Sequence, residues 1–485
     1  MMNKNKLFRI RQNRTWLILG ISILLMYGCV PTREIREENS SLPKNYQDSN
    51  MNDSLNTATI NWKEFFSDTH LVALIDTALE NNQELNIMLQ QVSMAKNKIK
   101  ARKGEYLPSV NIQAAAEVEK VGRYTSQGAN DANTDIRPEE EFPEPLPNYA
   151  VGAFASWELD VWKKLRNEKK AAVMEYLATM EGRNFMVTNL ISEIADAYYE
   201  LQALDNELAI IEQNLELQSN ALKTIRIQKQ AARATELGVK RFEAEFLKNR
   251  SEKYAVAQEI VEVENKINFL IGRRPQPIVR ESDLFIEKKI DTIYSGIPSQ
   301  LLQNRPDIKR AEFELAAAKL DTKAAKANFY PSFTIRAGVG LEAFSTRFLT
   351  STPESLLYTL AGDMVAPLIN RNAIKAVYAT ANDRQLQAIY DYEKAILNAY
   401  IEVENGISKI ENLRKSYELK EEQVAALTES IDLTNKLFRS ARADYLEVLL
   451  TQRESLESKM ELVETKKDQL LARVAMYRNL GGGWQ

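Results

Sequence analysis

Two long stretches of the chain, residues 190–271 and 392–480, repeat apolar residues at alternating steps of three and four. This spacing is typical of a coiled-coil seam rather than of an isolated amphipathic helix. We therefore expect two long helical hairpins whose helices pack along such seams. The first seam is Ile194, Ala197, Leu201, Leu204, Leu208, Ile211 and Leu215; the second is Ile396, Ala399, Val403, Ile410, Leu413, Tyr417, Val424, Leu427, Ile431 and Phe438.

Shorter stretches alternate apolar and polar residues with a period of two, which predicts strands with one apolar and one polar face. They lie near residues 109–120, 148–158, 332–343 and 354–364. A helix from Thr69 to Lys103 is expected before the first strand. A Pro- and acid-rich loop, about 123–148, follows that strand, and we expect it to lack secondary structure; loops of this length are usually functional or exposed at a surface. The polar face is expected to carry Asn111, Gln113, Arg336 and Glu342.

The two halves of the chain are internal repeats. The Tyr-Pro-Ser-Phe run at 330–333 aligns with the Leu-Pro-Ser-Val run at 107–110, an offset of 223. The offset falls to 202 where Ala399 aligns with Ala197, and rises to 209 where Leu446 aligns with Leu237. The fall places an excess of 21 residues in the first interstrand loop. The rise is one heptad near the hairpin turns, which keeps the seam in register.

These patterns predict four segments. Residues 1–28 form a signal peptide and 29–60 an extended tether. Residues 61–290 form the first repeat, with a helix, two strands and a long helical hairpin at 161–271. Residues 291–485 form the second repeat, with a helix, two strands and a hairpin at 370–480.

The signal peptide prediction rests on a basic, acid-free start followed by an apolar run from Trp16 to Tyr27. That run is too short to span a bilayer comfortably. Cys29 follows Gly28 directly and is the only cysteine in the chain. This arrangement resembles a bacterial lipoprotein signal, in which the thiol of Cys29 becomes the site of lipidation. A plain secretory signal with a coincidental cysteine is the alternative.

Composition narrows the function classes. A formal net charge of −4 without a basic patch argues against a nucleic-acid partner. One histidine, His70, and one cysteine argue against His/Cys metal sites and against Ser-His or Cys-His catalysis. We therefore expect no enzyme activity and no cofactor other than a covalent lipid on Cys29.

Four strands cannot close a pore, because a small barrel needs about eight. The strands therefore form either a small soluble sheet beside a helical bundle, or part of a barrel that a trimer completes with twelve strands. The helix expected from Val161 to about Ala231 would be about 105 Å long if unbroken. Helices of that length favour the second interpretation, with a helical tunnel continuing the barrel.

The chain resembles TolC-type outer-membrane efflux factors of the NodT-like lipoprotein branch. The resemblance covers the chain from Cys29 onward and rests on four runs: Asn-Trp-Lys-Glu-Phe-Phe at 61–66, the strand-to-helix junction at 157–163, Ile-Pro-Ser-Gln-Leu-Leu-Gln-Asn-Arg-Pro-Asp-Ile at 297–308, and Leu-Gly-Gly-Gly-Trp at 480–484.

The resemblance implies a mainly α protein with a small β part. It further implies a homotrimer with a twelve-stranded transmembrane barrel in outer-membrane lipid and a periplasmic α-helical barrel. Such a duct conducts substrates passively from an inner-membrane efflux pump of the RND type, through a periplasmic adaptor, to the exterior. The alternative is a lipid-anchored periplasmic coiled-coil scaffold without a pore.

By the same resemblance the hairpin turns form the periplasmic tip. Many relatives carry Asp where Leu450 stands, so an acidic ring is not expected at that position. The resemblance implies a channel constriction at Leu446, Glu447 and Leu450, and adaptor contacts at Thr235, Glu236, Leu237, Gly238, Asp444 and Tyr445.

Two further groups of residues have structural interpretations. The Arg305-Pro306-Asp307 run is expected to begin a helix and to act in packing and capping. Trp157 and Trp162 either mark the membrane–water boundary or pack between strands and helices.

Overall fold

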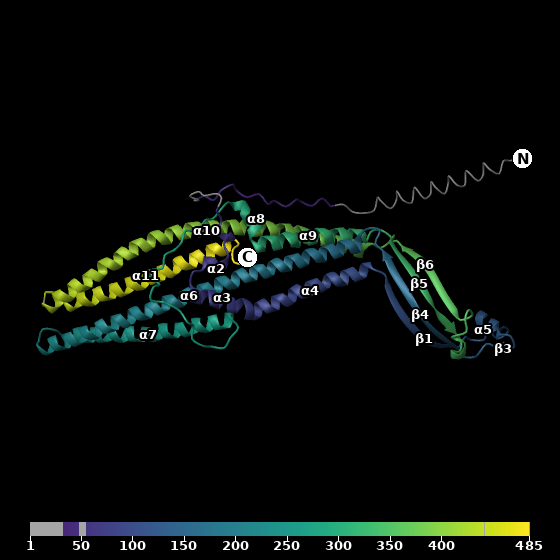
Figure 1. Ribbon diagram of the computed structural model, residues 1–485, viewed down its shortest axis with the longest axis horizontal. Coiled ribbons are helices and arrows are strands. Elements are labelled where there is room, and N and C mark those ends of the chain that lie inside the picture. The colour runs from purple at the N-terminus through teal and green to yellow at the C-terminus, as the bar shows by residue number, and fades with distance from the viewer. Residues whose placement is uncertain (1–32, 48–54, 441, 485) are drawn as a thin grey trace. The chain divides into compact units, whose positions relative to one another are not determined.

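The computed structural model describes residues 33–47, 55–440 and 442–484 (Figure 1). The fold is mainly α with a small β part, as expected. The chain divides into two compact units, which we call the strand unit and the hairpin unit. Of the described residues, the strand unit comprises 33–37, 93–177 and 313–390, and the hairpin unit comprises 38–47, 55–92, 178–312, 391–440 and 442–484. Each unit therefore takes residues from both sequence repeats.

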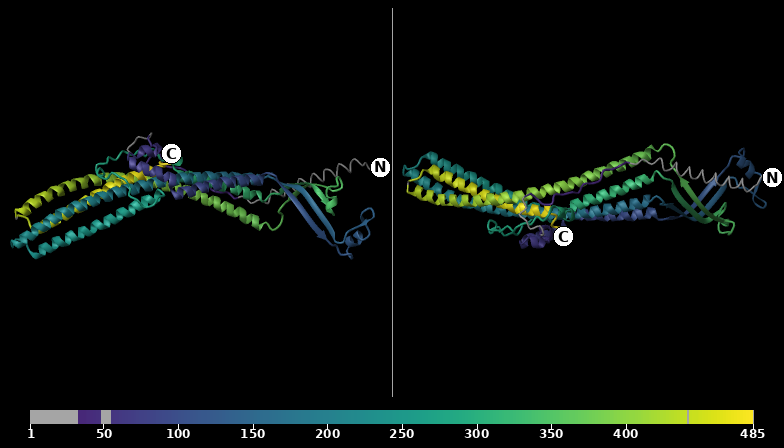
Figure 2. Two further views of the ribbon diagram at one scale, coloured as in Figure 1. Left: turned by 60° about the horizontal axis from the view of Figure 1, so that its bottom comes forward. Right: turned by 90° about the horizontal axis from the view of Figure 1, so that it is seen from above.

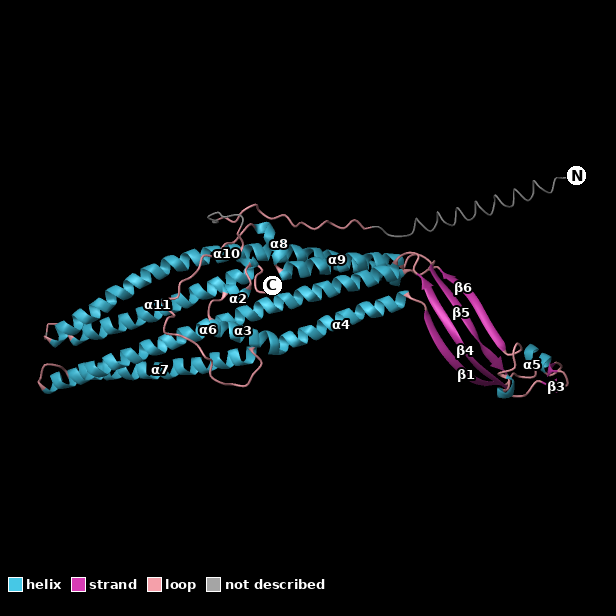
Figure 3. Cartoon of the chain, viewed as in Figure 1, coloured by secondary structure: helices cyan, strands magenta, loops and turns pink. Residues whose placement is uncertain are grey.

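The strand unit contains one antiparallel sheet in the order β1-β4-β5-β6 (Figure 3). The strands are β1 (Ser109–Glu119), β4 (Leu146–Leu159), β5 (Ser332–Ala343) and β6 (Leu356–Val365). They lie where the alternation predicted them. Because β4 pairs with β5, the strands of both repeats form a single sheet. Strands β1 and β6 are its two edges within the chain.

The prediction that residues 123–148 carry no secondary structure is wrong. They contain α5 (Ser126–Asp131), β2 (Asp135–Arg137) and β3 (Glu140–Glu141). Thr125 caps α5 by accepting a hydrogen bond from the Gly128 amide at 3.1 Å. The guanidinium groups of Arg137 and Arg347 both lie over the Phe348 ring, and Arg347 also pairs with Glu140. These contacts hold the first interstrand loop against the second, which contains the short 3₁₀ helix η3 (Thr346–Phe348).

Two helical hairpins dominate the hairpin unit and run side by side there in every view (Figures 1 and 2). The first consists of α6 (Lys164–Gln230) and α7 (Glu236–Leu270), and the second of α10 (Asn372–Arg439) and α11 (Tyr445–Asn479). None of the helices in the described part of the chain is both long and apolar enough to cross a membrane.

The two predicted seams are buried to different extents. Ile194, Leu201 and Ile211 of the first seam are fully buried in the main apolar core. In the second seam Ile396, Ala399 and Val403 are buried, but the stretch from Ile410 to Ile431 is only half-buried. The second hairpin therefore leaves part of its apolar seam uncovered within one chain.

The single helix predicted from Thr69 to Lys103 is instead two helices, α3 (Thr69–Asn81) and α4 (Gln83–Tyr106), which follow the short α2 (Trp62–Phe65). The break is at Asn82, whose backbone is extended (ψ 128°). The second repeat breaks at the equivalent residue, Arg305, between α8 (Leu301–Asn304) and α9 (Pro306–Ala327). The 3₁₀ turn η2 (Pro298–Gln300) precedes α8.

The two breaks have the same physical cause. The Asn82 side chain donates to the Leu270 carbonyl at the end of α7 at 2.8 Å. The Arg305 guanidinium donates to the Asn479 carbonyl at the end of α11 at 3.0 Å. Each interrupted helix thus supplies a partner for an orphan carbonyl at the end of a long one. As expected, Pro306 begins α9, and Asp307 lies in its first turn.

Residues 33–47 are extended, as expected for the tether, but they lie against α10. Arg33 pairs with Asp383 at 2.7 Å in the strand unit. In the hairpin unit, Tyr46 is 3% exposed and stacks on Tyr400. The packed part of the chain also begins earlier than the predicted residue 61. The 3₁₀ helix η1 (Thr57–Thr59) is fixed by a hydrogen bond from the Thr57 amide to the Tyr294 carbonyl.

Candidate functional site

The first hairpin turn, between α6 and α7, is closed by backbone hydrogen bonds. The Arg233 amide donates to the Gln228 carbonyl at 2.8 Å, and Ala232 adopts a left-handed conformation (φ 56°). This is the usual C-terminal motif of a helix. Thr235 then caps α7, with its hydroxyl accepting from the Gly238 amide at 3.1 Å. The turn is therefore a defined structure with a cap at each end.

The second turn, between α10 and α11, is built in the same way at an offset of 209. The Arg442 amide donates to the Leu437 carbonyl at 2.9 Å. Asp444 caps α11, and its own amide donates to Glu447 Oε2 at 3.3 Å, completing a capping box. Glu447, a predicted constriction residue, thus has a local role in ending the turn. Its side chain is also exposed.

The two turns pack on each other through a small apolar cluster, the tip cluster. Gly238 is buried at its centre: a Cβ there would lie 3.0 Å from Ile225 and 3.5 Å from the Tyr445 ring. The absence of a side chain at Gly238 therefore allows the two turns of one chain to approach closely. The buried members of the cluster are Leu222, Ile225, Val239, Phe242, Phe438 and Val448.

The predicted constriction residues lie on the side of α11 that faces away from the tip cluster. Leu446 and Leu450 are both 37% exposed and stand one helical turn apart, with Glu447 beside them. Val448, between them, is 1% exposed and fills the cluster. The three residues thus present one continuous surface, as a constriction requires. Their role in a constriction stays a prediction.

The predicted adaptor contacts separate into surface and interior positions. Thr235, Glu236, Leu237 and Asp444 are exposed. Tyr445 is half-buried, and Gly238 is buried against Ile225 and the Tyr445 ring. The packing of the two turns against each other determines which of these residues are exposed. The spacing of residues in the sequence did not indicate that packing.

Charged side chains surround the first turn. Glu236 pairs with Lys229 across the turn, and Glu243 pairs with Lys240 at 2.9 Å and with Arg226. Hydrogen bonds from the lysines hold the pKa of both carboxyl groups below its usual range. Both carboxylates are therefore ionised at neutral pH, and the turn presents paired charges to solvent.

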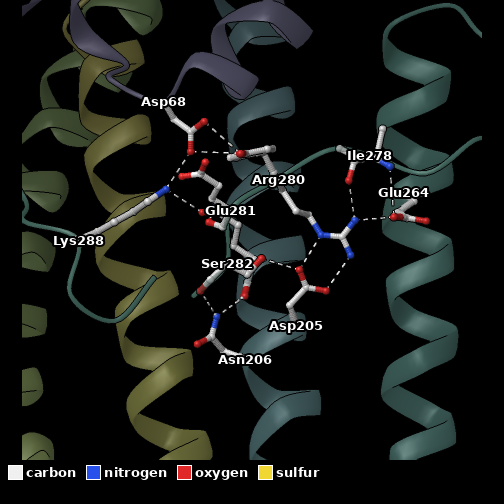
Figure 4. A network of polar contacts seen from close by, with 11 residues as sticks. Asp68, Asp205, Asn206, Glu264, Ile278, Arg280, Glu281, Ser282 and Lys288 are labelled. Atoms are coloured by element: carbon white, nitrogen blue, oxygen red, sulfur yellow. Dashed lines mark hydrogen bonds and ion pairs between the residues drawn. The ribbon is translucent and has the colours of Figure 1, made fainter. Parts of the chain in front are cut away.

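The sequence did not indicate a second feature, which we call the linker clasp. It is formed by linker residues 271–297 on the helices of the hairpin unit (Figure 4). Arg280 makes two hydrogen bonds to Asp205 of α6, at 2.6 and 2.7 Å, and one to Glu264 of α7 at 2.5 Å.

Lys288 forms the second part of the linker clasp. Its ammonium group bridges Asp68, the N-cap of α3, and Gln202 of α6. The Lys288 carbonyl accepts from Lys466 of α11 at 2.5 Å, one of several contacts that attach the linker to the second hairpin.

The sheet has one apolar and one polar face. Directly opposed residues share a face, so the register places Ile112, Ala153, Val339 and Tyr358 in one row. The opposite face carries the expected Asn111, Gln113, Arg336 and Glu342. On that face Asn148 donates to Glu342 at 2.7 Å, and Arg336 pairs with Asp363.

The tryptophans at the strand–helix junctions bind backbone carbonyls. Trp157 donates to the Tyr106 carbonyl at 3.1 Å, and Trp162 donates to the Pro331 carbonyl at 2.7 Å. Trp162 also stacks on Tyr330 with ring centroids 4.7 Å apart. Trp157 thus contacts the end of α4 and Trp162 the residue before β5, while the two side chains remain 38% and 40% exposed.

Two points concern ligands. Across residues 33–47, 55–440 and 442–484, no three His, Cys, Asp or Glu side chains are grouped so that they could hold a metal ion. Cys29, the predicted lipidation site, lies outside the described residues.

Comparison with known proteins gives consistent results. A sequence model of the family described as "Outer membrane efflux protein" matches residues 74–273 and 297–482. The pyoverdine export outer membrane protein OpmQ of Pseudomonas aeruginosa is 26% identical over 424 residues, covering 87% of each chain. The cation efflux system protein CusC of Escherichia coli O6:H1 is 25% identical, covering 95% of this chain and 97% of that protein.

Among solved structures, the open state of the Neisseria gonorrhoeae MtrE outer membrane channel superposes with a TM-score of 0.82. The two sequences are 23% identical, and the match covers 94% of this chain and 99% of the MtrE chain. The fold is thus that of a known outer-membrane channel, and the family match extends over both repeats. This chain belongs to the outer membrane efflux protein family.

Proposed function

We propose that three copies of this chain form an outer-membrane exit duct. Each copy contributes four strands to a twelve-stranded barrel and two hairpins to a helical tunnel. The duct conducts substrates passively, without a catalytic step, from an inner-membrane pump of the RND type through a periplasmic adaptor. The observation that carries the proposal is a sheet with two open edges and an uncovered apolar face.

The edge strands are too exposed for a sheet that functions alone. Ile112 of β1 is 84% exposed, and Tyr358 and Leu360 of β6 are 78% and 81% exposed. Exposure of these apolar side chains to lipid would be favourable, but exposure of the unpaired backbone amides and carbonyls of the edge strands to lipid would not. Edge-to-edge pairing with further copies satisfies the backbone groups and leaves the apolar face outward. Twelve strands also exceed the roughly eight that a closed barrel needs.

The helices carry a second uncovered apolar surface. Leu247, Tyr254 and Val261 of α7 follow one another at heptad spacing and are 55%, 66% and 47% exposed. On α10, Leu419 and Leu433 stand two heptads apart and are 67% and 53% exposed. Apolar residues at heptad spacing typically pack against a facing helix in a coiled coil. Neighbouring copies in a trimer would supply that helix.

We further propose that Cys29 is lipidated, because it is the only cysteine of the chain and follows Gly28 at the end of an apolar run. Cys29→Ser is expected to abolish incorporation of labelled palmitate; unchanged labelling would contradict lipidation at this residue.

Conductance tests the duct. The purified protein in detergent is expected to be a trimer by light scattering and to give discrete conductance steps in planar bilayers. A stable trimer without conductance would instead favour the pore-free scaffold. A monomer with no conductance would reject both the barrel and the tunnel.

A matched pair of variants tests the tip. Leu446→Ser is expected to raise the conductance of the resting channel, because it removes an apolar side chain from the predicted constriction. Leu237→Ser changes the equivalent residue of the first turn. It is expected to leave conductance unchanged and to weaken crosslinking to the adaptor. Equal conductance changes in both variants would contradict the assignment of the constriction to α11.

A further inference from the structure

The hairpin unit has three levels between the linker clasp and the turns. The clasp lies at Asp205 of α6 and Glu264 of α7 (Figure 4). The tip cluster lies at Leu222 and Ile225 of α6 and at Val239 and Phe242 of α7. The buried members of the main apolar core nearest the turns are Ile211 and Val256, and the half-buried Leu215 also packs against this core. The tip cluster is a separate cluster.

Between these two apolar clusters lies a layer of buried uncharged polar residues, which we call the polar layer. Its members are at most 7% exposed and come from three of the four helices. They are Asn214 and Gln218 of α6, Asn249 of α7, and Gln452, Ser455 and Ser458 of α11.

Most members of the polar layer have side-chain atoms without a hydrogen-bond partner. Both polar atoms of Asn249 are buried and unpaired, as are Asn214 Nδ2, Gln218 Oε1, Gln452 Oε1 and Ser458 Oγ. Asn249 and Ser458 occupy equivalent positions of α7 and α11, at the offset of 209. One pair of positions in the layer therefore recurs in both repeats.

Unpaired buried polar groups cost free energy that opening of the structure recovers, because opened groups bind water. Apolar groups behave in the opposite way, since their burial is lost on opening. A polar layer between two apolar clusters thus lowers the cost of local opening at its own level. The tip cluster can then open as a cooperative unit separate from the part of the hairpin unit that the linker clasp holds.

We propose that the polar layer is the hinge on which the tips of the two hairpins move relative to the part held by the linker clasp. The tip cluster moves as one body, and the clasp keeps the rest of the hairpin unit fixed. This inference rests on the proposed duct, because it describes how its periplasmic end opens.

Hydrogen exchange on the full-length protein in detergent tests the hinge. In the wild type, backbone amides at 222–242 and 438–448 are expected to exchange faster than those at 198–206. The double variant Asn249→Leu/Gln452→Met fills the layer with apolar side chains of similar size. It is expected to slow exchange of the tip amides at least about tenfold, equivalent to about 1.4 kcal/mol. Amides at 198–206 are expected to change less than twofold.

Asn265→Leu is the matched control, because Asn265 is an exposed asparagine on the same helix, α7. It is expected to leave tip exchange unchanged. Gln218→Met alone provides a second test should the double variant fail to fold, with slowing in the same direction. Tip exchange within twofold of the wild type, or equal slowing at the clasp, would overturn the hinge.

Conductance separates this proposal from the duct itself. In planar bilayers the double variant is expected to spend a smaller fraction of time open than the wild type. If the wild type conducts but the tip exchange does not respond, the hinge alone is wrong. If the wild type does not conduct, the duct is wrong, and the exchange pattern still decides whether the tips move at the polar layer.

Discussion

Replacement of Arg305 by methionine tests the joint between the interrupted helix and the long hairpin. The Arg305 side chain is 6% exposed, makes two hydrogen bonds to Asp307, and also donates to Glu402 and the Asn479 carbonyl. Removing one member of a buried ion pair costs about 3–5 kcal/mol. Asp307 and Glu402 are 25% and 36% exposed, so water replaces part of what they lose. We therefore expect Arg305→Met to lower the free energy of unfolding by about 2–3 kcal/mol.

The measurement is urea unfolding in detergent, followed by far-UV circular dichroism at the helical band. Arg414→Met is the control, because Arg414 pairs with Glu411 and Glu418 on the exposed side of α10. It is expected to change stability by less than about 0.5 kcal/mol. A loss below 0.5 kcal/mol for Arg305→Met, or equal losses in the two variants, would refute the reasoning.

Two further predictions concern a turn and a half-buried acid. Gly272→Ala is expected to cost about 2 kcal/mol or more, because Gly272 has φ +71° and a Cβ there would lie 2.5 Å from the Asn81 carbonyl oxygen. Gly104→Ala, in an open helical position, is expected to raise the free energy of unfolding by up to about 1 kcal/mol. Equal changes in the free energy of unfolding for the two glycine variants would refute this prediction. Burial, with Glu464 nearby, raises the pKa of Glu207 to about 7. Its contribution to stability is therefore present below its unfolded pKa and lost as pH rises through about 7. Glu207→Gln is expected to be about 1 kcal/mol more stable than the wild type at pH 8, after allowance for partial exposure, with a smaller difference at pH 5.5. A pH-independent difference would contradict the assignment.

Period-two alternation was a sufficient guide to the sheet. It placed all four strands and the polar face, because a strand's side chains alternate whatever their partners are. It could not give the order β1-β4-β5-β6, since strand pairing depends on residues far apart in the sequence. The same limit applies to the linker clasp, where Arg280 and Asp205 are 75 residues apart.

The helix break at Asn82 shows a different limit. Apolar periodicity continues across the break, so the pattern predicted one helix. Asn82 does carry a local signal, because its side chain accepts from the Leu85 amide at 2.8 Å as an N-cap would. The decisive contact is the distant one to Leu270. Gly238 is a similar case: its burial depends on Tyr445, which belongs to the other hairpin.

The change of offset from 202 to 209 has a specific location in the structure. Leu222 stands eight residues before the end of α6 at Gln230, whereas its counterpart Val424 stands fifteen before the end of α10 at Arg439. The returning helices α7 and α11 are both 35 residues long, so the extra heptad lies in α10. Seven residues rotate an α-helix by only about 20° from its starting phase. Phe438, which follows the insertion, is accordingly buried in the tip cluster with Leu222 and Ile225. The two hairpins can thus differ in the length of one helix while their turns still meet.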